Sequence, residues 1–123
     1  MTRLFQVDAF THHRFSGNPA AVCLLENPKP DAWMQALAAE MNLSETAFLQ
    51  KQANGYGLRW FTPATEVKLC GHATLASSWI LFSEGIIPVD RVIHFHTLSG
   101  ILQARWEEQA VVLDFPAFKG AKQ

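Results

Sequence analysis

The sequence predicts an α+β domain in which a curved sheet wraps around a central apolar helix. Residues 71–83 read as a helix whose apolar side chains, Leu75, Trp79 and Phe82 among them, fall on nearly every side. A helix of this kind is normally enclosed by other structure. Short runs of strand-forming residues lie before and after it along the chain. In a small domain with several strands, a curved sheet is the natural enclosure for that helix.

Length and composition fit one domain, residues 1–123, with a packed core. The chain has 123 residues, of which 49% are hydrophobic and 17% charged, and its formal net charge is -1; this composition excludes a disordered chain. No basic run predicts nucleic-acid binding, and no apolar stretch reaches the about 18 residues that span a membrane. Cys23 and Cys70 form no disulfide framework, and the start has no signal-peptide segment, so the cytoplasm is the expected location.

The first half of the chain predicts strands, a turn and an amphipathic helix. Strands are expected at 4–10 and 20–25, with a turn of Gly, Asn and Pro between them. After a proline-containing loop, a helix is expected to run to a stop at Asn42. Its apolar residues recur at helical spacing, at Trp33, Met34, Leu37, Ala38 and Met41.

The second half predicts a hairpin, the enclosed helix and three further strands. A turn at 53–57 joins a strand at 46–51 to a return strand at 58–62, which Pro63 ends. After the enclosed helix at 71–83, strands are expected at 92–98, 101–106 and 111–115.

The start of the enclosed helix carries the strongest chemical signal. The run Cys70-Gly71-His72-Ala73-Thr74 opens the helix with small residues, a thiol and an imidazole. A helix start exposes unpaired backbone N–H groups and the positive end of the dipole, so it binds carboxylates and other anions. A lone His near a helix start is more often structural, but His72 is expected to stay neutral there, which suits a proton shuttle or a substrate anchor. A thiol at a helix start is acidified and can act as nucleophile or base, but a small buried residue is the favoured interpretation of Cys70, because only one such thiol is present.

Glu45 is the candidate general base. It lies in Ser44-Glu45-Thr46-Ala47-Phe48, between a helix with an apolar face and a strand. A general base must be fixed in place and partly desolvated to work near neutral pH, and this junction offers both conditions. The alternative is a solvated carboxylate at a helix-to-strand junction.

No motif predicts a metal or an organic cofactor. The pairs His12-His13 and His94/His96 have no Cys or carboxylate at ligand spacing beside them. Polar residues on the solvent side of a strand explain the second pair more simply. The glycines fit neither a phosphate-binding loop nor a dinucleotide fingerprint.

Four spaced motifs resemble those of the PhzF family of phenazine-biosynthesis-like proteins. In chain order they are Phe15-x-Gly17-Asn18-Pro19-Ala20-Ala21-Val22, Ser44-Glu45-Thr46-Ala47-Phe48, Arg59-Trp60-Phe61-Thr62-Pro63 and Cys70-Gly71-His72-Ala73-Thr74. The opening Val7-Asp8-Ala9-Phe10-Thr11 is also similar. The resemblance covers nearly the whole chain.

The resemblance implies a diaminopimelate-epimerase-like fold, a mostly antiparallel sheet curled around a central helix. It also implies isomerase chemistry without metal or organic cofactor, in which a carboxylate takes a proton from a substrate carbon and returns it elsewhere. The catalytic groups then fall on Glu45 and His72. Related epimerases place a catalytic thiol where Cys70 stands, and in this family Glu45 takes over that work. Substrate binding is assigned to Asn18, Cys70, Gly71, Ala73 and Thr74.

One departure from the family is large. Members are usually about twice this length and hold the active site in a cleft between two similar domains, whereas this chain resembles only the N-terminal half. The first hypothesis is an isomerase domain for a small carboxylated substrate, completed as a homodimer or by a second chain. The alternatives are an inactive half that binds or assembles, and a racemase that uses Cys70 as base.

Overall fold

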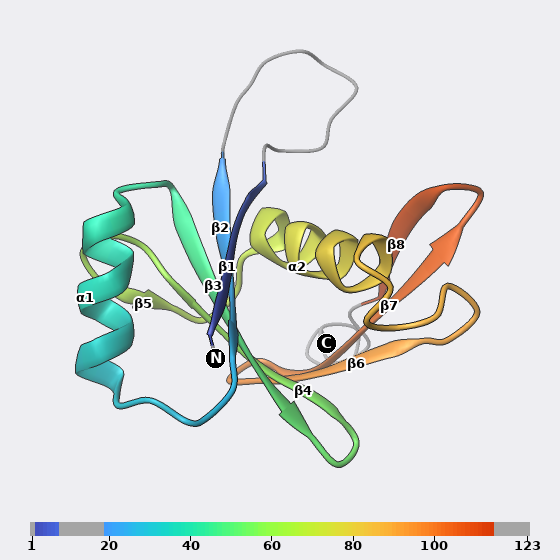
Figure 1. Ribbon diagram of the computed structural model, residues 1–123, viewed down its shortest axis with the longest axis horizontal. Helices are drawn as coiled ribbons and strands as arrows, with labels where there is room; N and C mark the ends of the chain where they lie inside the picture. The colour runs from blue at the N-terminus through green and yellow to red at the C-terminus, as the bar shows by residue number, and fades with distance from the viewer. Residues whose placement is uncertain (1, 8–18, 115–123) are drawn as a thin grey trace, which may run out of the picture.

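The computed structural model describes residues 2–7 and 19–114 of the chain, which form one curled sheet with a helix on each face (Figure 1). The strands are Arg3–Val7 (β1), Ala20–Leu25 (β2), Glu45–Gln52 (β3), Gly55–Phe61 (β4), Glu66–Val67 (β5), Ile93–Thr97 (β6), Gly100–Glu107 (β7) and Ala110–Asp114 (β8). The helices are Asp31–Met41 (α1) and Gly71–Ser83 (α2).

The sheet has the order β1-β2-β3-β4-β6-β7-β8, and β5 pairs with the end of β4. Two neighbours, β2–β3 and β4–β6, are parallel, and the other pairs are antiparallel. Each parallel pair is joined by a crossover that contains a helix, as parallel pairing requires. The expected fold, a mostly antiparallel α+β sheet curled around a central helix, is confirmed.

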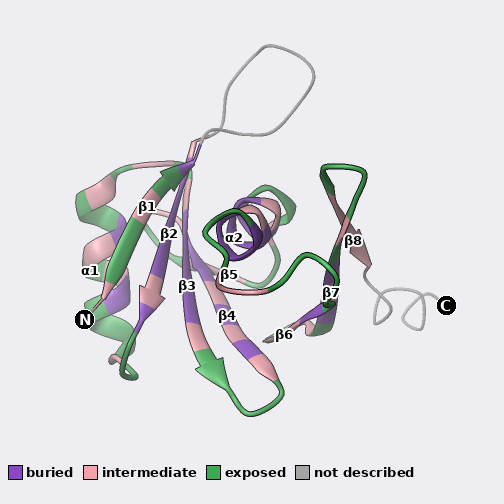
Figure 2. Ribbon diagram, turned by 45° about the vertical axis from the view of Figure 1, so that its right-hand side comes forward, coloured by how far each residue is buried: buried purple, intermediate pink, exposed green. Residues whose placement is uncertain are grey.

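The α2 helix lies in the hollow of the sheet and is buried along most of its length (Figures 1 and 2). Its buried serine hydroxyls form hydrogen bonds within the helix. Ser77 donates to the Ala73 carbonyl at 2.7 Å, and Ser78 donates to the Thr74 carbonyl at 2.8 Å. The sheet supplies alternate residues to the core around α2, chiefly Leu49, Leu58, Trp60, Phe95 and Leu102.

The α1 helix covers the outer face of β3 and β4. It buries Met34 and Ala38 in a smaller cluster that includes Phe48 and Phe61. The predicted stop at Asn42 is confirmed: this residue has a left-handed φ of 55° and donates its N–H to the Ala38 carbonyl at 3.1 Å.

Two local features differ from the sequence prediction. The β4 strand begins at Gly55 instead of residue 58, because this glycine takes a φ of 135° and its α-carbon packs against the His94 carbonyl. The short β5 strand was not expected, since two residues are too few to show an alternating pattern. The first strand is described from Arg3 to Val7, so the rest of that prediction lies outside the described residues.

Candidate active site

Glu45 is the first residue of β3 and lies on the side of the sheet that faces α2. Ala47 and Leu49, which share its face at two-residue spacing, belong to the core around α2. Glu45 itself is half-buried. Its carboxylate lies within hydrogen-bonding reach of the thiol of Cys70, the residue that precedes α2. The structure therefore brings the acidic side chain and the start of the enclosed helix together.

Burial raises the pKa of the Cys70 thiol to about 11, and the Glu45 carboxylate adds to this increase by its charge and as a hydrogen-bond acceptor. The backbone N–H groups of Ala73 and His72 bond to the sulfur and lower the pKa, but their effect is smaller. The expectation that this helix start acidifies the thiol is therefore wrong, because desolvation outweighs the amides. Near neutral pH the thiol is protonated and can donate to Glu45.

The other predicted site residues divide into accessible and buried groups. Gly71 and His72 are exposed, and a Cβ built on Gly71 would meet no atom of another described segment within 4 Å, so these segments leave the backbone there accessible to a ligand. Ala73 and Thr74 are fully buried. The Thr74 hydroxyl donates to the Cys70 carbonyl at 2.7 Å and accepts from the Trp60 indole at 3.0 Å, which fixes the helix start on β4.

Two further points concern the predicted substrate contacts. Asn18 lies outside the described residues. The backbone groups of Ala73 and His72 lower the pKa of the Cys70 thiol, so this part of the predicted anion cradle acts on the sulfur. The exposed Gly71 end of the helix and the helix dipole are the features left for an anion.

The segment that leads into α2 is anchored by side chains that the sequence analysis did not select. The Gln35 amide of α1 donates to the carbonyls of Thr62 and Pro63 at 2.9 and 3.2 Å. The Ser99 hydroxyl donates to the Lys68 carbonyl at 2.6 Å. Both bonds join a side chain to a backbone group far away in sequence, and no local pattern reveals such a contact.

Arg59 links three elements on the outer face of the sheet. Its guanidinium makes two bonds of 2.8 Å to the Glu66 carboxylate and one of 2.9 Å to Asp31 at the start of α1. The hydrogen bond and charge of Arg59 hold the pKa of Asp31 below its usual range. Adjacent residues of a strand point to opposite faces of the sheet, and Trp60, the neighbour of Arg59, faces α2. Arg59 and its two carboxylate partners therefore stabilise the fold on the face opposite Glu45.

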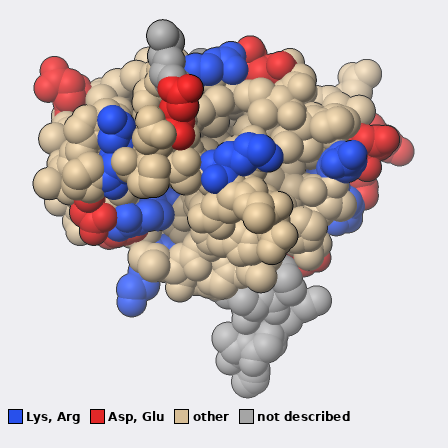
Figure 3. All heavy atoms as spheres, turned by 60° about the horizontal axis from the view of Figure 1, so that its bottom comes forward, with Lys and Arg blue, Asp and Glu red and all other residues tan. Residues whose placement is uncertain are grey.

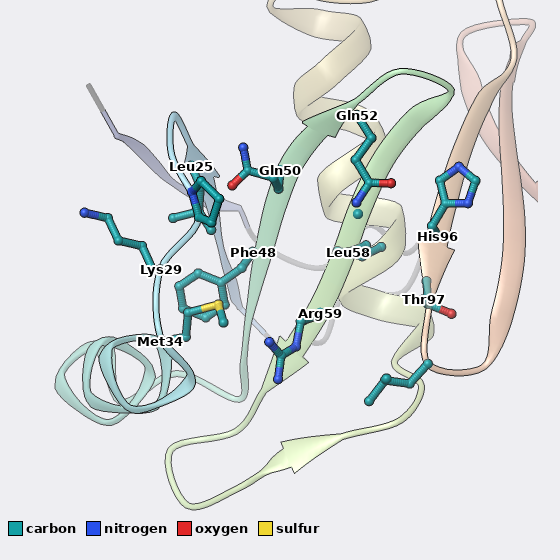
Figure 4. A pocket seen from close by; sticks show the side chains of 13 residues that line it. Leu25, Lys29, Met34, Phe48, Gln50, Gln52, Leu58, Arg59, His96 and Thr97 are labelled. Atoms are coloured by element: carbon teal, nitrogen blue, oxygen red, sulfur yellow. The ribbon is translucent and has the colours of Figure 1, made fainter.

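A hollow of about 360 Å³ lies on the α1 side of the sheet and is not lined by Glu45 or by residues 70–74 (Figure 4). The described residues contain no group of three side chains placed to bind a metal, and none of their helices has the length and apolarity to cross a membrane. Charges of both signs are scattered over the face in Figure 3.

Residues 7–122 match the family model of the phenazine biosynthesis-like proteins, PhzC-PhzF. The chain belongs to this family. An uncharacterized isomerase of Halalkalibacterium halodurans is 56% identical over 116 residues, which are 94% of this chain and 44% of that protein. The human phenazine biosynthesis-like domain-containing protein is 53% identical over 123 residues, covering 94% of this chain and 42% of that protein. The resemblance seen in the four motifs is confirmed.

Solved structures agree with this assignment. A PhzF-family protein of Enterococcus faecalis aligns with a TM-score of 0.78 and 48% identity, covering 85% of this chain and 40% of that one. A hydroxyproline epimerase of Agrobacterium vitis, solved with trans-4-hydroxy-L-proline, aligns with a TM-score of 0.65 and 16% identity over 90% of this chain and 41% of that one, a likeness of fold alone. This member of the PhzC-PhzF family spans less than half the length of the relatives it matches.

Proposed function

We propose that this chain forms the Glu45-bearing half of a PhzF-type isomerase, which moves a proton on a small carboxylated substrate without metal or organic cofactor. The placement of the half-buried Glu45 carboxylate beside the start of α2 carries this proposal. Support comes from the 56% identity to a relative named an isomerase and from the fold shared with a hydroxyproline epimerase.

The proposed reaction is a proton transfer at a carbon of the substrate. Glu45 removes the proton, and negative charge grows on the substrate as the C–H bond breaks. The positive end of the α2 dipole, at Gly71 and His72, stabilises that charge. Because the helix is already folded and oriented, the protein does not have to rearrange as the charge grows. Protonated Glu45 then returns the proton to a different position or face. The interaction with the charge that grows during the reaction is stronger in the transition state than in the ground state, so it accelerates the chemical step.

His72 and Cys70 have different roles in this proposal. His72 is exposed at the second residue of α2 and orients the substrate or relays the proton. Cys70 does not act as the base, because a thiol with its pKa raised to about 11 is protonated near neutral pH. This direction of the pKa argues against a racemase that depends on a Cys70 thiolate.

A second domain or subunit completes the site in this proposal. The chain covers 42–44% of the curated relatives, and Glu45 is half-buried. A homodimer can place the same surface of two copies face to face, and a separate chain can do the same. Light scattering measures the molar mass and separates a dimer from a monomer.

The cytoplasmic location stays a prediction from the sequence.

Glu45→Gln tests the proposed base. Proton NMR in D₂O measures solvent deuterium uptake at carbon in a panel of small carboxylic acids. General acid–base catalysis contributes roughly 10²–10⁴-fold, so we expect a loss of that size with an unchanged fold. The matched control is Glu40→Gln, which neutralises an exposed carboxylate of α1. Exchange at the wild-type rate in Glu45→Gln removes Glu45 from the mechanism.

The partial coverage also favours a second candidate, a half-domain that binds or assembles without catalysis. Such a protein binds a carboxylic acid at the start of α2 but shows no exchange at carbon, alone or with a partner. Deuterium uptake that depends on Glu45 excludes this candidate.

A further inference from the structure

A hollow on the outer face of the sheet, on the side opposite Glu45, has the properties of a second binding site. Its volume is about 360 Å³, at the small end of the range for ligand pockets. The loop after β2 and α1 form one wall, β3 and β4 form the floor, and the end of β6 forms the other wall (Figure 4).

The floor of the hollow is largely apolar, and the Gln52 carboxamide lies over Gly57. Phe48 and Met34 present buried apolar side chains beside it. A Cβ on Gly57 would lie 2.5 Å from the Gln52 amide nitrogen, so the glycine lets that carboxamide lie across the strand. Figure 4 shows Gln50 and Gln52 extending on this side of β3. An apolar body with a polar group at its edge matches such a lining.

The charged side chains that line the hollow, Lys29 and Arg59, are both cations. Arg59 is already bonded to the carboxylates of Glu66 and Asp31, which offset its charge. The Lys29 ammonium lies 5.1 Å from the centre of the Trp33 ring, and among the described residues no carboxylate lines the hollow beside it. The unbalanced charge at the rim therefore belongs to Lys29 and favours an anionic group.

Gln50 adds a polar side chain to the lining of the hollow. Its side-chain oxygen is buried and receives no hydrogen bond from the part of the chain that the structure describes. Because a carboxylate only accepts hydrogen bonds, rotation of this carboxamide can offer a bound anion its amide N–H groups and not its oxygen.

We propose that this hollow binds a compact apolar carboxylate. The apolar body rests between Phe48 and Met34, beside the Gln52 carboxamide that covers Gly57, and the carboxylate pairs with Lys29. This site is separate from the proposed reaction at Glu45, because the two lie on opposite faces of β3.

The test uses 1-naphthoate as the probe and the 123-residue chain labelled with ¹⁵N. We expect amide shift changes at residues 29, 31–34, 48–52 and 57–59, which surround the hollow. The neutral analogue 1-naphthalenemethanol should bind at least about tenfold more weakly, because it lacks the charge-assisted contact to Lys29. Gly57→Val should abolish binding by filling the floor. The Cβ of this side chain presses on the flexible end of Gln52 and meets the Gln50 carbonyl only at an ordinary contact distance, so the fold can adjust.

Lys29→Gln and Lys51→Gln form a matched pair. Both lysines cover an aromatic ring, at 5.1 Å from the Trp33 centre and 5.7 Å from the Tyr56 centre, but only Lys29 lines the hollow. We expect Lys29→Gln to weaken 1-naphthoate binding about tenfold and Lys51→Gln to leave it unchanged. Equal losses in the two variants, equal binding of the alcohol, no binding at all, or shift changes centred on residues 70–74 would each overturn the proposal.

Discussion

The two helices of this domain pack on opposite faces of one sheet and are held there by different interactions. α2 is enclosed, and eight of its residues are buried, including the fully buried Leu81. α1 lies outside with Met34 and Ala38 buried, and polar contacts from Gln35 and Asp31 join it to the loop after β4 and to Arg59. The enclosed helix is therefore placed by apolar burial, and the outer helix depends more on directed polar contacts.

Both helices contribute to the geometry around Glu45. α2 provides the helix start with Cys70 and His72, and its first turn is fixed by the bond from Trp60 to Thr74. α1 acts at a distance, because Gln35 holds the loop that leads toward that helix start. A destabilising substitution in either helix should therefore alter the geometry around Glu45. A change in α2 acts directly on the helix start, whereas a change in α1 acts through the loop after β4, and the two should lower the free energy of unfolding by different amounts.

The largest expected effect is the loss of the α2 core contact in Leu81→Ala. The side chain is fully buried, so its removal leaves a cavity and lowers the free energy of unfolding by about 3–5 kcal/mol. The matched change on the outer helix is Leu37→Ala, which removes a partly buried side chain at the edge of the smaller cluster and should cost about 1 kcal/mol. Urea unfolding measures both values. Equal losses would contradict the difference between the two helices.

This contrast between the helices was largely predictable from the sequence. Apolar residues on one stripe predicted α1 and its end at Asn42, and apolar residues all round predicted α2 over residues 71–83, as the structure has them. The residues did not predict the parallel pairing of β2 with β3 and of β4 with β6, because it depends on crossovers between distant segments. Burial of a helix on all sides is visible in its own residues, whereas strand order is a property of the whole chain.

The candidate site was predictable to a smaller extent. Glu45 and the start of α2 were selected from local patterns, and the structure places them together. Gln35 and Ser99 were missed because their partners are carbonyls more than 25 residues away. The direction of the Cys70 pKa was predicted wrongly, since the sequence shows the helix start but not how deeply the sulfur is buried.

The next largest effect concerns the polar contacts of α1. Arg59→Gln removes the partly buried bonds to Glu66 and the bond to Asp31, and should lower the free energy of unfolding at pH 7 by about 1–2 kcal/mol. Arg105→Gln is the control, because it breaks an exposed pair with Glu107 and should cost less than about 0.5 kcal/mol.

The pH dependence of this loss gives a sharper test. Arg59 lowers the pKa of Asp31 in the folded state, so this contribution to stability is present above the unfolded pKa and is lost as pH falls through the folded pKa. The difference between wild type and Arg59→Gln should therefore be full at pH 7 and shrink in acid. Unfolding curves from pH 7 down to the acid limit of folding measure it. A difference that does not change with pH would mean that Arg59 stabilises by packing alone.

The smallest expected effect compares one thiol from each face of the sheet. Burial raises the pKa of Cys23, in the α1 cluster, and of Cys70, at the start of α2, to about 11 in both cases. Their charged neighbours differ in sign, because Lys29 lowers the pKa of Cys23 and Glu45 raises that of Cys70. Glu45→Gln should therefore lower the pKa of Cys70. Since the thiolate is the reactive form, alkylation of Cys70 by iodoacetamide should become up to about tenfold faster at a fixed alkaline pH.

Cys23 serves as the internal control, and its alkylation rate should not change. Peptide mass spectrometry measures the alkylation of each thiol separately. Faster alkylation of both thiols would indicate a general loosening of the fold, and an unchanged Cys70 rate would separate Glu45 from this thiol.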